Sequence, residues 1–316
     1  MDHQRTLKSA AHCAGVGVHS GQAANLTIRP ADKNTGFVFV RTDITDKNNR
    51  IVGLWDNVTE TRLCTVLSND EGATISTVEH VLSALAACGV DNAILEIDGP
   101  EIPIMDGSAQ AFLDMIDNVG TIAQDAQKRY ILVKKPISFE EDGKIVTLMP
   151  SLDPHWHMNI NFDSQAIGQQ HHSFDNSLRR YRTDIADCRT FGFLQEVEML
   201  QKMGLARGGS LENAIVIDGD DVLNPGGLRH KTEFVRHKIL DAIGDIILAG
   251  APVLADYHGN KAGHAMNNKV LHALFQDKEA FEFISAARLS QLQQKQAHNS
   301  QQRKPQPAYD SEVLSA

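Results

Sequence analysis

One segment, residues 232–246, limits the possible folds more than any other, because it predicts a helix that carries metal-binding side chains in need of partners. Its apolar residues recur at helical spacing, at positions 234, 235, 239, 242, 243 and 246. His237 and Asp241 are four residues apart, so on a helix they point the same way, one turn above the other. A rigid element then offers two ligands to one metal ion. The plainer and more common alternative for such a pair is a hydrogen bond at the surface.

A catalytic zinc ion usually has three protein ligands and one open position, so a third ligand must come from another element. Thr77–Cys88 offers one on a second apolar helix, which Gly89 ends. His80 could bind the metal while its neighbour Glu79, about 100° around the helix, flanks the bound water. Two other interpretations stay open. Ser76 and Glu79 also fit a capping box, and His80 also fits a core histidine.

Composition and charge argue against several classes of protein. The net charge of −10 and the pI near 5.7 exclude nucleic acid as the main partner. None of the four cysteines forms a C-x-x-C pair, so reduced thiols in a cytoplasmic protein are expected. The N-terminus lacks the apolar core of a signal peptide, and the longest apolar run, residues 242–253, is too short to span a bilayer. We expect at most peripheral contact with membrane lipid.

The order of periodic segments predicts an α+β fold in two halves. In the first half we expect helices at 80–88 and 108–118 and strands at 25–29, 37–41 and 93–97. A polar stretch without a clear period, residues 120–129, predicts the boundary. In the second half we expect strands at 130–134, 137–139, 145–149, 157–162 and 253–257, and helices at 194–203, 232–248, 267–275 and 278–287.

The tail from Leu289 is polar and has little apolar content. It cannot bury enough surface to offset the entropy of ordering, so we expect disorder over residues 289–316. The mildly apolar end, Val313–Ala316, is a candidate recognition site for a protease.

Seven blocks of this sequence, taken together, resemble UDP-3-O-acyl-N-acetylglucosamine deacetylases (the LpxC family), zinc amidases that commit bacteria to lipid A synthesis. Each block is weak alone, but all occur in the family's order between about residues 3 and 285. The blocks are GVGVHSG (15–21), ISTVEH (75–80), GPEIPIMDGS (99–108), RTFG (189–192), GGS (208–210), EFVRHKILD (233–241) and GHAMNN (263–268).

The resemblance implies the metal ligands and the base. His80, His237 and Asp241 match the ligands of one zinc ion per chain, for which iron(II) is an alternative. Glu79 matches the general base. Zinc lowers the pKa of bound water from about 15.7 to about 7, which makes hydroxide available at neutral pH.

Three further residues match catalytic positions of the family. His264 matches a cationic histidine that donates a proton and stabilises the oxyanion. Asp245, one turn beyond the ligands, matches the carboxylate that keeps this histidine charged. Thr190 matches a hydroxyl that holds the tetrahedral oxygen, and losing one such donor typically slows a reaction by roughly 10²–10³.

The substrate side of the resemblance is a UDP-linked acylated glucosamine. Lys238, Phe162 and His19 match contacts to the nucleotide or sugar. A βαβ insert at about 191–217 would supply an apolar channel for the acyl chain. The channel residues that we expect are Leu63, Cys64, Phe191, Phe193, Leu194, Val197, Ala206 and Ser210, with further apolar surface from Met199, Leu200, Leu211 and Ala214. Arg207 and Asn213 bring polar groups to the same region, so the preferred acyl length stays open.

The implied fold is an α+β sandwich of two domains, each a β-sheet packed by helices, with the helix layers stacked face to face and the active site between the domains. Residues 1–125 would form the first domain and contribute Glu79 and His80. Residues 126–288 would form the second and contribute His237, Asp241 and His264. We expect a monomer. The alternatives are a zinc amidase for another N-acyl sugar and a non-catalytic sugar-nucleotide-binding protein. Glu79 argues against the non-catalytic protein, because binding alone has no use for a base.

Overall fold

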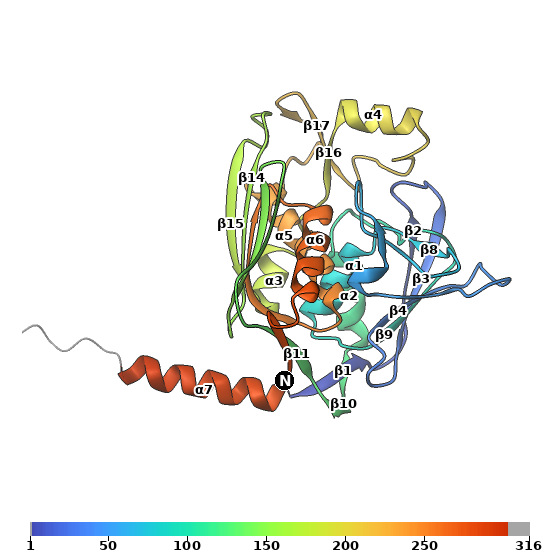
Figure 1. Ribbon diagram of the computed structural model, residues 1–316. Helices are drawn as coiled ribbons and strands as arrows, with labels where there is room; N and C mark the ends of the chain where they lie inside the picture. The colour runs from blue at the N-terminus through green and yellow to red at the C-terminus, as the bar shows by residue number, and fades with distance from the viewer. Residues whose placement is uncertain (1, 303–316) are drawn as a thin grey trace, which may run out of the picture.

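The computed structural model describes residues 2–302, which form an α+β protein with sheets on the outside and most helices between them (Figure 1). The helices up to residue 127 are η1 (Trp55–Asn57), α1 (Glu79–Ala87) and α2 (Gln110–Val119). The strands of this part are β1 (His3–Leu7), β2 (Ala11–Val16), β3 (Ala23–Pro30), β4 (Phe37–Arg41), β5 (Arg50–Val52), β6 (Val58–Glu60), β7 (Val66–Ser68), β8 (Thr74–Ile75), β9 (Ala93–Ile97) and β10 (Thr121–Gln127).

The remaining described residues contain the other elements. Their strands are β11 (Arg129–Val133), β12 (Ile137–Glu141), β13 (Lys144–Pro150), β14 (His155–Asn161), β15 (Gln169–Asp175), β16 (Phe191–Phe193), β17 (Ile215–Asp218), β18 (Asp221–Val222), β19 (Val253–Asn260) and β20 (Phe281–Ser285). Their helices are α3 (Leu178–Asp184), α4 (Leu194–Lys202), α5 (Glu233–Ile246), η2 (Ile247–Ala249), α6 (His264–Gln276) and α7 (Ala286–Gln302).

The first large sheet has the strand order β2-β3-β9-β4-β5, with β4 and β9 parallel. Side chains of β9 alternate between buried and half-buried, so one face of the sheet packs on the core. Within the polar stretch where we predicted the boundary, residues 121–127 form strand β10, which the sequence did not predict, and pair with β1. Pairing with a distant strand orders a segment that has no apolar period of its own.

The second large sheet has the order β12-β13-β19-β11-β20, with β14 and β15 attached through β19. Strand β19 is its centre: one edge is antiparallel to β13, and the other is parallel first to β11 and then to β14. The predicted helix at 278–287 is wrong, because β20 pairs antiparallel with β11 there. A smaller sheet, β16-β17-β18, contains a parallel βαβ unit in which α4 joins β16 to β17.

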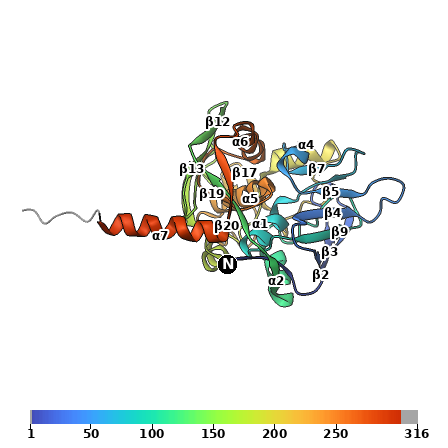
Figure 2. The same ribbon diagram turned by 60° about the horizontal axis from the view of Figure 1, so that its bottom comes forward.

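The disorder that we expected from residue 289 is wrong up to residue 302, because α7 is helical and projects from the body (Figures 1 and 2). Leu289 and Leu292 pack against Leu254 and Ile284 at the base of the helix. The long polar side chains beyond them are good helix formers. Residues 303–316, including the candidate protease site, lie outside the described residues.

Each described sheet takes all its strands from one side of residue 128. This distribution supports a division near residue 125, which stays a prediction. Helices α1 and α2 lie beside the first large sheet, while α3, α5 and α6 lie beside the second, so the two groups of helices meet in the middle (Figure 1). Within residues 2–302, no helix combines the length and the apolar character that crossing a membrane requires.

The contact between α1 and α5 is close because α5 has a glycine where the helices cross. A Cβ atom at Gly244 would lie 1.9 Å from the carbonyl oxygen of Glu79. Only a residue without a side chain allows this approach. Helix α5 is buried on nearly all sides, as expected for a core helix. The crossing brings the first turn of α1, with His80, to the face of α5 that carries Asp241.

Candidate metal centre and active site

His80 from α1 and the pair His237 and Asp241 from α5 form one buried cluster. Asp241 Oδ1 lies 3.2 Å from His237 Nε2 and 3.6 Å from His80 Nε2. One candidate ligand atom from each of the three residues lies within 4.8 Å of the others, and all three side chains are almost fully buried. The structure thus brings together the three residues that the sequence predicted as ligands.

The donor atoms of this cluster face one another in a way that fits a cation. His237 Nδ1 lies 3.0 Å from the carbonyl oxygen of Cys188, which can only accept, so Nδ1 carries the proton and Nε2 offers a lone pair. Asp241 Oδ1 has no hydrogen-bond partner among the described residues. A buried carboxylate oxygen that faces two imidazole nitrogens is a suitable set of ligands for zinc or iron(II).

The charges around the cluster favour the forms that bind metal. Burial lowers the pKa of His237 to about 3, so its ring is neutral. Burial alone would raise the pKa of Asp241, but the positive charges of Lys238 and His264 help to hold it well below its usual value. Lys238 Nζ donates to Asp241 Oδ2 at 2.8 Å, which leaves Oδ1 for the cluster.

Glu79 lies beside the cluster and does not act as a helix cap. The residue before α1 is Val78, and no side chain caps the helix, while Ser76 Oγ donates to the carbonyl oxygen of Pro100. The capping-box alternative is therefore wrong. Glu79 Oε2 instead accepts the backbone N–H of Thr65 at 3.1 Å. Burial raises the pKa of Glu79, although nearby His264 and His80 oppose this, so the carboxylate can take a proton.

His264, the first residue of α6, lies on the other side of Glu79. Its Nε2 lies 3.8 Å from Glu79 Oε1, and its Nδ1 lies 2.8 Å from Asp245 Oδ2. Burial alone would lower the pKa of His264, but these two carboxylates raise it to about 9. The imidazole is therefore cationic at neutral pH and can donate a proton.

A cavity of about 480 Å³ opens next to Glu79 and His80. Apolar side chains from α4, β16, the loop between β6 and β7 and the segment 206–214 form much of its wall. Thr190 lines it too, held by hydrogen bonds of its backbone N–H to Gly107 and of its carbonyl oxygen to Ile215. The predicted substrate-binding residues in its wall are His19, Leu63, Cys64, Phe191, Leu194, Val197, Ala206 and Ser210, together with Leu200, Leu211 and Ala214.

Three predicted substrate contacts lie outside this wall. Phe162 packs edge-on against Phe191, with ring centres 5.8 Å apart, and tilted against Phe193 at 6.1 Å. Lys238 Nζ lies 5.6 Å from the centre of the Phe191 ring. Phe162, Phe193 and Lys238 therefore form a group around Phe191, which itself lines the cavity.

Other side chains of the insert point away from the cavity. Met199 is 56% exposed and does not line it, so its expected place in the channel is wrong. Arg207 is exposed, while Asn213 is buried and bonds to backbone atoms of Ser210 and Gly208. Neither polar residue is part of the wall, which removes the conflict that the sequence raised.

Three residues of the site were missed. Thr65 holds Glu79 through its backbone N–H and Asp245 through its hydroxyl, at 2.6 Å. Asn267 donates to Asp245 at 2.8 Å. Glu101 accepts the backbone N–H groups of His19 and Ser20. Asn267 and Glu101 lie within two of the seven resembling blocks, which was a usable signal, whereas nothing in the sequence singles out Thr65.

Comparisons with known proteins point to one family. Residues 4–276 match the family described as LpxC, UDP-3-O-acyl N-acetylglycosamine deacetylase. The chain is 50% identical over 271 residues to a UDP-3-O-acyl-N-acetylglucosamine deacetylase of Phenylobacterium zucineum, which covers 86% of this chain and 92% of the relative. Proteins of the same name from Shewanella loihica and Histophilus somni are each 46% identical, over 287 and 290 residues, with 90% of this chain and 94% of each relative covered.

Proposed function

The chain belongs to the LpxC family of UDP-3-O-acyl-N-acetylglucosamine deacetylases, and from this premise we propose how its own residues perform the reaction. The activity is hydrolysis of the N-acetyl group of UDP-3-O-acyl-N-acetylglucosamine, a step of lipid A biosynthesis that releases acetate. In this proposal His80, His237 and Asp241 hold one zinc ion. The observation that carries it is the buried Asp241 Oδ1, which faces two imidazole nitrogens and lacks any hydrogen bond among the described residues.

A zinc ion at this position supplies Lewis-acid chemistry, acidifying a water molecule and polarising a carbonyl group. Glu79 takes the proton of the attacking water, as its raised pKa and its place beside His80 allow. The N-acetyl carbonyl becomes a tetrahedral oxyanion, to which the hydroxyl of Thr190 donates. The amine leaves badly unless it is protonated, and cationic His264 gives it that proton.

The cavity is the proposed site of the acyl chain, since it is largely apolar and begins at the catalytic carboxylate. Lys238, Phe162 and His19 are proposed to contact the sugar or nucleotide. The two-domain sandwich, divided near residue 125 with the active site between its halves, completes the proposal, and the separate sheets support it. A monomeric state and a cytoplasmic location stay predictions.

One experiment tests the catalytic part of this proposal. Purified protein is assayed for bound metal and for acetate release from acylated UDP-N-acetylglucosamine, with Glu79→Gln beside the wild type. Glutamine can still accept the N–H of Thr65, so the variant should fold and keep its metal. Removing a general base should slow turnover by roughly 10²–10⁴. If Glu79→Gln retained near wild-type turnover, the assignment of the base would be refuted.

A further inference from the structure

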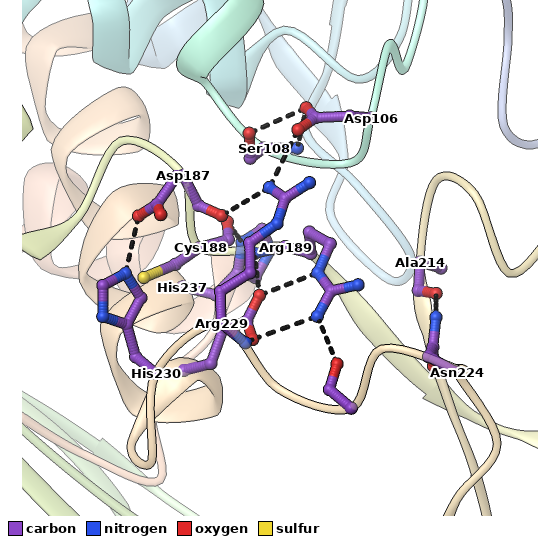
Figure 3. Close-up of polar contacts among 12 residues, drawn as sticks. Asp106, Ser108, Asp187, Cys188, Arg189, Ala214, Asn224, Arg229, His230 and His237 are labelled. Carbon is purple, nitrogen blue, oxygen red and sulfur yellow. Dashed lines mark hydrogen bonds and ion pairs between the residues drawn. The ribbon is translucent and has the colours of Figure 1, made fainter.

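Arg189 and Glu233 form a buried ion pair next to Cys188, whose carbonyl oxygen accepts a hydrogen bond from His237 Nδ1. Figure 3 shows Arg189 with Cys188 and His237 beside it. The side chain of Glu233 is fully buried, and Arg189 is only 8% exposed. Arg189 Nε donates to Glu233 Oε1 at 2.9 Å, and Arg189 Nη2 donates to Glu233 Oε2 at 3.2 Å. Such paired contacts between a guanidinium and a carboxylate are directional as well as strong.

The Glu233 carboxylate also holds the backbone on both sides of the pair. Its Oε1 accepts the N–H of Arg189 at 3.0 Å, and its Oε2 accepts the N–H of Arg229 at 2.6 Å. Arg189 in turn donates to the carbonyl oxygen of Gly227 at 2.8 Å. Every oxygen of this carboxylate thus accepts one side-chain and one backbone donor. Two loops are fixed relative to the start of α5.

The residues on either side of Arg189 both reach the active site. The carbonyl oxygen of Cys188 accepts the proton of His237 Nδ1, which turns Nε2 toward the other two candidate ligands. Thr190 lines the cavity. Because the three residues are consecutive, a shift of the backbone at Arg189 displaces the Cys188 carbonyl and the Thr190 hydroxyl together.

Helix α5 carries the positioning carboxylate and the candidate ligands at intervals of four residues. Glu233, His237, Asp241 and Asp245 follow one another at about one turn each. Glu233 holds the 187–190 segment, His237 and Asp241 belong to the candidate metal cluster, and Asp245 holds His264. The carboxylate at the start of the helix is therefore part of the same row of side chains as the ligands.

We propose that Glu233, acting through Arg189, is a positioning residue of the metal centre. It sets the place of the Cys188 carbonyl, which orients His237, and of the Thr190 hydroxyl. This inference rests on the proposed function, because it takes His237 as a metal ligand. A pair that served only the stability of the fold would leave the metal affinity of the folded protein unchanged.

A neighbouring group, Asp187, Cys188 and His230, has the composition of a second metal site but does not compete with this interpretation. His230 Nε2 is already hydrogen-bonded to Asp187 Oδ1 at 2.8 Å (Figure 3). Cys188 Sγ donates to the carbonyl oxygen of Asp184, and burial raises the pKa of its thiol. The possible ligand atoms of this group are therefore hydrogen-bonded to each other or protonated, and we assign no metal to the group.

The test uses the full-length protein with Glu233→Gln, which keeps the shape of the side chain but turns one acceptor into a donor that faces other donors. Loss of a residue that orients a ligand typically weakens metal binding or activity by roughly 10–100-fold. We expect the dissociation constant for zinc, measured by competition with a chelator, to rise by this factor. The kcat for acetate release should fall similarly, with a smaller change in KM.

Asp91→Asn is the matched control. Asp91 accepts the backbone N–H of Arg5 at 2.8 Å and pairs with Lys128 at 2.7 Å, and both charged side chains are largely buried. Like Glu233, Asp91 is a buried carboxylate that binds one backbone N–H group and one charged side chain. Its partners, Arg5 in β1 and Lys128, lie next to no candidate metal ligand in sequence. Asp91→Asn should leave the zinc dissociation constant unchanged.

A second variant covers the case in which Glu233→Gln does not fold. Arg189→Lys keeps a cation but loses the planar fork, so it should weaken zinc binding with less disturbance. Folding of each variant is checked by circular dichroism and thermal unfolding. The inference is overturned if folded variants bind zinc like the wild type, or if Asp91→Asn weakens zinc binding equally. If the wild type itself bound no zinc, the metal centre in the proposed function would fail first.

Discussion

Asp245 Oδ2 lies 2.8 Å from His264 Nδ1, and this contact joins the ligand-bearing helix α5 to the start of α6. The other oxygen of Asp245 accepts the hydroxyl of Thr65 at 2.6 Å, so the carboxylate cannot turn away. Its charge, with that of Glu79, raises the pKa of His264 to about 9 although burial alone would lower it. We therefore expect the protonation of His264 to limit activity at alkaline pH.

Asp245→Asn should shift the alkaline limit of activity to lower pH. An acid must be protonated to act, so activity falls as pH rises through the pKa of His264. Asparagine removes the largest influence that raises this pKa, and burial then lowers it. At neutral pH the loss should reach roughly 10²–10⁴, the usual contribution of a general acid. The measurement is the pH profile of kcat/KM for acetate release.

The control for this variant is Asp256→Asn, which removes the same charge from β19, where the carboxylate accepts the N–H of His155. Its pH profile should match the wild type. An alkaline limit that stays near pH 9 in Asp245→Asn would show that His264 is not the group that titrates there.

His237→Ala and Asp241→Ala should each lose zinc. Each removes one of the three clustered ligands, so affinity should fall by more than the roughly 10–100-fold that loss of a supporting residue causes. Metal content is measured by mass spectrometry after dialysis against a chelator. His12→Ala is the control, because His12 is an exposed residue of β2 whose Nδ1 lies 2.9 Å from Thr27 Oγ1. Equal metal content in all four proteins would contradict the ligand assignment.

Local periodicity was enough to place His237 and Asp241 together, because a four-residue spacing on a helix has only one geometric meaning. It could not show that His80 joins them. That depends on α1 crossing α5 at Gly244, a contact between segments far apart in the chain. The residues alone made His80 a candidate third ligand but left a core histidine as an alternative, and the family resemblance supplied the assignment. The same limit explains why Thr65 was missed: its backbone N–H donates to Glu79 only because the loop between β6 and β7 folds next to α1.

Tertiary pairing also explains the wrong secondary-structure predictions. Residues 278–282 include lysine, glutamate and alanine, which favour helix locally, but β20 pairs with β11 and buries Ile284. In α7, two leucines three residues apart are enough to attach a polar helix to the body. Composition describes the whole tail and misses this short apolar contact.

Gly244→Ala should impair both stability and turnover. The new Cβ would lie 1.9 Å from the carbonyl oxygen of Glu79, a backbone atom that cannot move alone, so α1 must shift against α5. Overpacking of this kind costs roughly 1–3 kcal/mol of folding free energy. A displacement of about 1 Å at a catalytic group can slow a reaction by about 10². Thermal unfolding and the acetate assay measure the two effects.

Gly226→Ala is the control for the glycine variant, since a Cβ there has no atom within 4 Å and the backbone is not left-handed. It should behave like the wild type. If Gly244→Ala were equally harmless, the close helix crossing would not be what holds His80 and Glu79 beside Asp241.

Leu200→Trp should make the enzyme discriminate against long acyl chains. Leu200 lines the cavity from α4, and a larger ring there shortens the apolar space without touching the ligands. Each methylene that no longer fits can lower kcat/KM by roughly 10-fold or more, so substrates with short acyl chains should lose least. Met199→Trp adds the same ring to the neighbouring residue, which is 56% exposed and outside the wall, and should leave the ratio of rates unchanged. An equal loss for every chain length in Leu200→Trp would mean that the acyl chain binds elsewhere.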